Sequence, residues 1–308
     1  MRTTFLTEDQ IWGNNALEVI KKYGTRTGLT DLTVALGGCM GRGSTTSEGE
    51  KAGYVWSASA AGGTGVRVVD YDGDQGYWDP SRRKVAGRPV LPSSETSKIR
   101  PNAVRAAYLL GGQVKICEYG EYPQDVVSGR LEEELESAYE LEKNYKNSAL
   151  QRTGKRYTFD AADIRDYAQK FQKKEYEEYM LNGRKYVRIE GKRYDGDSVL
   201  SDGRDVRTGD PYWFEVKPIE WLMDEKSGIW VAKKALFAGI QFDGRAKYNG
   251  NFEQTDMKKY LDNYFSEEMQ NSQGFQIQNS YKNAAGEKAE PSKRQKGYGI
   301  QVVEEPLP

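Results

Sequence analysis

The residues best suited to chemistry lie between Tyr54 and Arg83, and the chemistry they suit is recognition. Large rigid aromatic side chains supply contact area there, and small polar and charged ones supply adaptable hydrogen bonds. We expect the aromatic faces to bury against a ligand while Asp and Arg side chains fix its orientation. The candidate ligand-binding residues are Tyr54, Trp56, Arg67, Tyr71, Asp72, Asp74, Tyr77, Trp78, Asp79, Arg82 and Arg83.

Several of these residues also allow a structural interpretation. Trp56 lies in a predicted strand, where aromatic side chains usually belong to the core. The loop setting of Trp78 favours exposure. The run Asp70–Asp74 resembles an oxygen-rich calcium loop but lacks the downstream Glu of an EF-hand, which favours a hairpin turn at Asp72-Gly73. Arg88 is expected to satisfy backbone carbonyls or a buried carboxylate.

The 308-residue sequence contains no histidine and two cysteines, which narrows the enzymatic alternatives. Without imidazole there is no Ser-His-Asp or Cys-His nucleophile and no His-containing zinc or iron site. Cys39 and Cys117 are expected to be reduced, buried small hydrophobes. A carboxylate pair, Glu215 and Glu220, could converge at a sheet edge but is not favoured. We therefore expect a non-enzymatic protein without a metal or cofactor.

The charge balance gives no reason to expect nucleic acid as a partner. The sequence has 45 basic and 46 acidic residues, so no global field attracts a polyanion. The N-terminus lacks the apolar run of a secretory signal, and no window resembles a membrane span. A cytoplasmic protein is expected, and a virion component released by lysis would look the same.

Apolar spacing and turn signals predict a mixed set of helices and strands. Helices are expected over 7–23, 29–36, 130–146, 161–174 and 255–265. Strands are expected over 54–59, 65–71, 85–91, 113–122, 176–181, 184–189, 212–222 and 228–232. The clearest hairpin turn is Asn182-Gly183.

These elements predict a single α+β domain over residues 1–270 and a flexible tail over 271–308. In this prediction 1–50 holds N-terminal helices and 51–92 holds the ligand-binding segment. The scaffold spans 113–270 and contains a β-hairpin insertion. The Lys- and Gly-rich composition of 284–297 is typical of a linker, which leaves room for a larger assembly through the tail.

Five short motifs resemble an uncharacterised domain of bacterial and phage proteins. They are G-E-Y-P-Q at 120–124, P-I-E-W-L at 218–222, Y-L-D-N-Y-F at 260–265, W-S-A-S at 56–59 and G-R-P-V-L at 87–91. The last two usually close such a domain but come first here, so the motif order is circularly permuted. Over about 50–270 the chain resembles the C-type-lectin-fold variable proteins that retroelements diversify in gut bacteria and their phages.

That resemblance implies a C-type-lectin-like scaffold that displays a hypervariable surface to a protein or carbohydrate ligand. Two alternatives remain open. A formylglycine-generating-enzyme-like oxidase would use Cys39 and Cys117, whereas a sensor or docking module would serve a larger ATPase-containing system.

Overall fold

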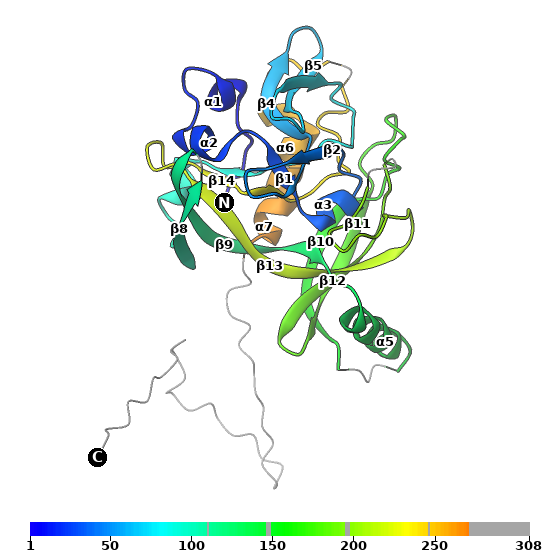
Figure 1. The fold of residues 1–308 in the computed structure, drawn as a ribbon. Coiled ribbons are helices and arrows are strands. Elements are labelled where there is room, and N and C mark those ends of the chain that lie inside the picture. Colours follow the sequence, from blue (N-terminus) through cyan, green and yellow to red (C-terminus); the bar gives the residue numbers. More distant parts are fainter. Residues whose placement is uncertain (110, 146–148, 195–197, 246, 271–308) are drawn as a thin grey trace, which may run out of the picture. The chain divides into compact units, whose positions relative to one another are not determined.

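Two long strands, β9 (Gly112–Val126) and β13 (Pro211–Met223), organise the main sheet of the computed structural model (Figure 1). The structure describes residues 1–109, 111–145, 149–194, 198–245 and 247–270. The two strands pair antiparallel, and their register shifts between Glu215 and Val216 and again between Pro218 and Glu220. Such bulges bend a strand and increase its twist, so β13 curves as it crosses the sheet.

The other strands of the main sheet extend this central pair. β12 pairs with the start of β13, β14 pairs with its end, and β8 pairs with β9. The bounds of these strands are β7 Val90–Leu91, β8 Ala103–Leu109, β10 Gln151–Asp160, β11 Lys173–Leu181, β12 Arg184–Glu190 and β14 Trp230–Ala232. The predicted hairpin is confirmed as β11–β12, where Asn182 and Gly183 both adopt positive φ, as a type I′ turn requires.

Two smaller sheets are built from the N-terminal part of the chain. One has the order β15-β1-β3-β2, and the other is the meander β4-β5-β6. Their strands are β1 Thr27–Leu29, β2 Met40–Thr45, β3 Lys51–Gly53, β4 Val55–Ala61, β5 Gly65–Val69, β6 Gln75–Trp78 and β15 Lys234–Ala235. β1 and β15 pair in parallel, whereas the other described strand pairs are antiparallel. Residues 1–50 therefore contain strands as well as the predicted helices.

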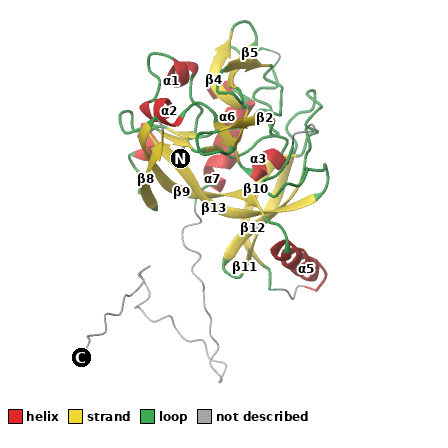
Figure 2. Cartoon of the chain, in the orientation of Figure 1, coloured by secondary structure: helices red, strands yellow, loops and turns green. Residues whose placement is uncertain are grey.

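Helices are few and mostly short (Figure 2). Their bounds are α1 Glu8–Trp12, α2 Glu18–Tyr23, α3 Asp31–Ala35, α4 Ser93–Thr96, α5 Arg130–Tyr145, α6 Asp256–Tyr260 and α7 Ser266–Glu268, with a 3₁₀ turn η1 Phe252–Gln254 and a π-helical turn η2 Leu261–Phe265. The single helix predicted over 7–23 is broken: α1 starts with a capping box at Thr7 and Gln10 and ends at Gly13, its extended C-cap residue.

The helix predicted over 161–174 is wrong. Side chains of Asp160, Asp163 and Asp166 accept hydrogen bonds from nearby backbone N–H groups, at 2.9 to 3.0 Å. Such local bonds compete with the helical ladder and favour turns. The segment is a loop that leads into β11.

The fold class is α+β, as predicted. Met1–Asn271 forms one compact unit. The predicted tail, 271–308, lies outside the described residues. A main hydrophobic core contains Trp221, Phe237 and Phe265. A smaller cluster joins Leu135 of α5 to β11, β12 and β13, the last through Trp213. Within the described residues, no helix has both the length and the apolar character to cross a membrane.

Candidate functional site

The meander β4-β5-β6 positions most of the residues expected to bind ligand. Its second turn is organised by Asp70, whose Oδ1 accepts the backbone N–H groups of Asp72 and Asp74, both at 2.9 Å. Gly73 completes this turn with φ of 89°. The acidic run therefore forms an Asx-type hairpin turn, the structural alternative to a calcium loop.

Three aromatic side chains from this segment gather at one place. The Tyr54 ring meets Tyr71 edge to face with centroids 5.3 Å apart, and meets Trp78 in the same way at 5.8 Å. Edge-to-face pairs of this kind stabilise one another beyond the area they bury. All three side chains are half-buried, so their remaining surface faces solvent.

Two cations lie over this aromatic group. The ammonium of Lys84 is 3.8 Å from the Trp78 centroid, 4.8 Å from Tyr194 and 5.9 Å from Tyr54. Lys84 is only 8% exposed, and among the described residues no carboxylate lies within ion-pair distance of it. The aromatic faces therefore provide its main electrostatic compensation.

Arg82 makes a second cation–π pair on the same ring. Its guanidinium lies 5.9 Å from the Trp78 centroid and 4.2 Å from that of Tyr167. We name the resulting group the cation–aromatic cluster: Tyr54, Tyr71, Trp78, Arg82, Lys84, Tyr167 and Tyr194. Tyr167 and Tyr194 come from distant loops, so sequence reasoning missed them. Lys84 was also missed.

Tyr77 and Arg67 lie apart from the cluster. They are paired across β5 and β6, so they share one face of the meander, while Trp78 occupies the other. Tyr77 is 71% exposed, and Arg67 forms an ion pair with Glu8 at 3.1 Å. The exposed acidic candidates are Asp72, Asp74 and Asp79. The structure thus divides the predicted surface into two faces.

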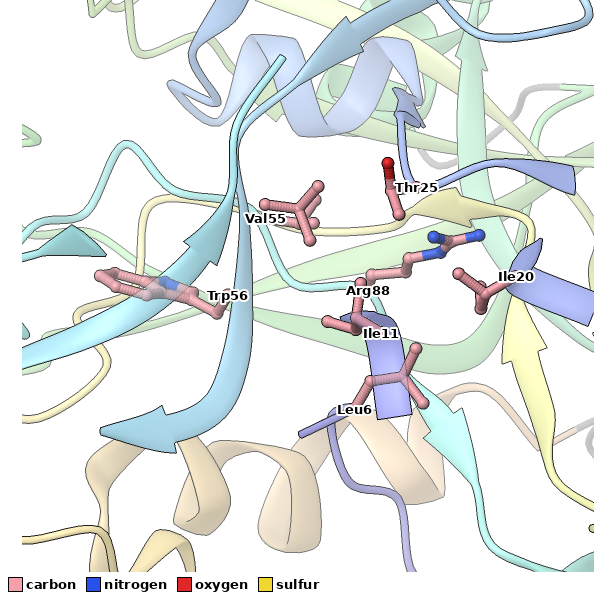
Figure 3. A pocket seen from close by; sticks show the side chains of 8 residues that line it. Leu6, Ile11, Ile20, Thr25, Val55, Trp56 and Arg88 are labelled. Carbon is pink, nitrogen blue, oxygen red and sulfur yellow. The ribbon is translucent and has the colours of Figure 1, made fainter. Parts of the chain in front are cut away.

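Trp56 is not part of this surface. It is 2% exposed, its ring packs against Phe242 with centroids 5.1 Å apart, and it pairs across β4 and β5 with Val68. It also lines a small internal cavity of about 10 Å³ together with Arg88 (Figure 3). The prediction that Trp56 binds ligand is therefore wrong. The segment that contains Phe242, nearly two hundred residues further along the chain, covers this face of its strand.

Arg83 is also buried and does not face a ligand. Its side chain is fully enclosed, forms an ion pair with Asp160 and donates to the Gln169 carbonyl. The Asp160 carboxylate in turn holds the backbone of the 161–172 loop. Arg83 therefore fixes the loop that carries Tyr167, while its neighbours Arg82 and Lys84 reach the cluster.

A polar groove of about 240 Å³ lies along β9 and β13. Its lining includes Lys217, Lys233, Lys234 and Glu220. Each lysine is already paired: Lys217 with Asp125 at 2.7 Å, Lys233 with Glu220 at 3.1 Å and Lys234 with Glu50 at 2.9 Å. A ligand there would have to break existing ion pairs, so the groove is better explained as a charge network.

Neither enzymatic alternative gains support from its residues. Burial raises the pKa of Glu220, but hydrogen bonds from Arg105 and Lys233 outweigh this and lower it, which does not suit a general acid. Glu215 has its own partners, Lys217 and Arg184. Cys39 and Cys117 are both buried, and burial raises the pKa of Cys117 to about 12, which disfavours a reactive thiolate.

Comparison with protein-family models, with curated proteins and with solved structures finds no match to this chain. The geometry of the cation–aromatic cluster is therefore the basis for assigning a function.

Proposed function

We propose that this protein is a non-catalytic ligand-binding protein that recognises a protein or carbohydrate through the cation–aromatic cluster. The observation that carries this proposal is the position of Trp78, which is half exposed and contacts Tyr54, Arg82 and Lys84 together. Because packing restricts the rings before any ligand arrives, little side-chain entropy is lost on binding. The exposed carboxylates of Asp72 and Asp79 supply polar contacts at the rim.

The flanks of the segment support display on a fixed scaffold. Trp56 is held in the core, and Arg88 is buried with hydrogen bonds to the Ala232 carbonyl at 2.7 Å and to Thr27 Oγ1 at 2.9 Å. Between these anchors the chain alternates buried residues such as Val68 and Arg83 with exposed and half-exposed residues. A retroelement-diversified, C-type-lectin-like surface requires this division between fixed flanks and a tolerant interior. We include that identity in the proposal, with a phage or gut-bacterial source.

Replacing Trp78 with Ala is expected to abolish ligand binding while leaving the fold intact. The full chain would be screened on a glycan array and against a random-peptide display library, and the variant would be tested on every hit. Lys84→Met should weaken the same hits. Near-wild-type binding by both variants, with unchanged circular dichroism, would remove the cluster from the site.

Tyr77→Ala provides a matched surface control. The side chain is 71% exposed and makes no contact with the cluster rings in the described structure, so the melting temperature should change by no more than about one degree. A drop of several degrees in a thermal scan would show that Tyr77 is structural. Binding lost in Tyr77→Ala but kept in Trp78→Ala would move the ligand to the opposite face of the meander.

A further inference from the structure

β8 presents an open edge of the main sheet. Among the described strands it pairs with β9 alone, and Figure 1 shows it at the margin of the sheet. Every residue of Ala103–Leu109 is exposed or half-buried. Val104 is 54% exposed and Tyr108 is 80% exposed, two of the most exposed large apolar side chains of the described structure. The strand therefore offers unpaired backbone groups together with apolar side chains.

The usual protections of an edge strand are missing from β8. It contains no proline or lysine, and its register with β9 runs without a shift from Ala103 opposite Glu118 to Leu109 opposite Gly112. Its one charged residue, Arg105, is paired with Glu220 at 2.6 Å. An edge strand with a regular register, apolar side chains and a charge that is already paired is suited to pairing with a further strand.

The sequence of β8 is complementary to itself. In an antiparallel pair of two β8 strands centred on Ala106, Val104 of each copy lies opposite Tyr108 of the other. Arg105 then lies opposite Ala107, so no like charges oppose one another directly. This pattern satisfies the requirement of a two-fold interface, in which the same patch serves both partners.

We propose that a second copy of this chain binds along β8 and extends the main sheet across a two-fold axis. A second copy suffices as the partner, because each Val104–Tyr108 contact across the axis comes from two copies of the same segment. The contact is narrow, so the dimer forms in a concentration-dependent way. It would double the number of ligand-binding surfaces, although the interface does not depend on the proposed function.

Cysteine cross-linking tests the register directly. Ala106→Cys places two thiols opposite each other, with Cα atoms about 4.5–5.5 Å apart, within the range that a disulfide spans. Ala103→Cys is the matched control on the same strand, because its two copies would lie roughly 20 Å apart in this register. Under mild oxidation, a non-reducing gel should show dimers for Ala106→Cys only. Equal cross-linking of both variants, or none of either, would overturn the proposal.

Sedimentation of the full chain over a range of concentrations gives the second test. The wild type should shift from monomer to dimer, and Tyr108→Lys should remain monomeric at the same concentrations. Tyr77→Lys, which changes another highly exposed tyrosine on a different sheet, should dimerise like the wild type, and thermal scans should show that all three are folded. A wild type that is monomeric throughout would leave the edge to another occupant. A Tyr108→Lys dimer would place the interface elsewhere.

Discussion

Replacing Arg83 with Met is expected to lower the free energy of unfolding by about 3–5 kcal/mol. The substitution leaves Asp160 as a buried carboxylate that has lost its guanidinium partner. It also removes the donor to the Gln169 carbonyl. Because Asp160 is buried and water cannot replace the lost guanidinium, the loss approaches the cost of an unpaired buried charge. Chemical denaturation followed by circular dichroism measures the change.

The adjacent variant Arg82→Met is the matched control for this prediction. Arg82 is half-buried and makes cation–π contacts instead of a buried ion pair, so its loss should cost about 1 kcal/mol or less. Adding Asp160→Asn to Arg83→Met should recover part of the loss, since the remaining partner is then uncharged. If Arg83→Met costs no more than Arg82→Met, the buried pair does not support the loop.

Glu268→Gln is expected to stabilise the protein at alkaline pH and to leave its stability nearly unchanged near pH 4.5. Burial raises the pKa of Glu268 from 4.5 to about 8. One carboxylate oxygen accepts the Thr158 backbone N–H at 2.8 Å, while the other is buried without a hydrogen-bond partner among the described residues. A neutral side chain is therefore preferred in the folded state.

The direction of the pH effect follows from proton binding. Between about 4.5 and 8 the folded protein keeps a proton on Glu268 that the unfolded chain releases. Stability from this group is therefore fully present below pH 4.5 and is lost progressively as the pH rises to about 8. At about 1.4 kcal/mol per pKa unit, the loss amounts to several kcal/mol.

Denaturation of Glu268→Gln and the wild type across pH 4 to 9 tests this expectation, with the exposed neighbour Glu267→Gln as control. The gap between Glu268→Gln and the wild type should widen with pH, whereas Glu267→Gln should follow the wild type. The opposite slope would show that Glu268 is ionised and held by Lys155, the cation whose charge favours its carboxylate.

Much of the local structure could be predicted from the sequence. The Asn182-Gly183 hairpin, the α5 helix, the helix starts at Thr7 and Thr255 and the Asp72-Gly73 turn all follow from turn and cap chemistry. β8 and β10 were missed because neither has the alternation of apolar and polar residues that marks a half-buried strand. Most of the segment predicted as a helix over 161–174 is a loop, because side chains of Asp160 and Asp163 accept hydrogen bonds from nearby backbone N–H groups and so favour turns.

The composition of the recognition segment is a property of the sequence, but the selection of its displayed side chains is a property of the tertiary structure. Alternation along a strand assigns residues to two faces without stating which face is covered. Trp56 became core because Phe242 lies against it, and Arg83 was enclosed because Asp160 was brought beside it. Lys84 acquired its aromatic surroundings in the same way, from rings that only long-range packing could bring together.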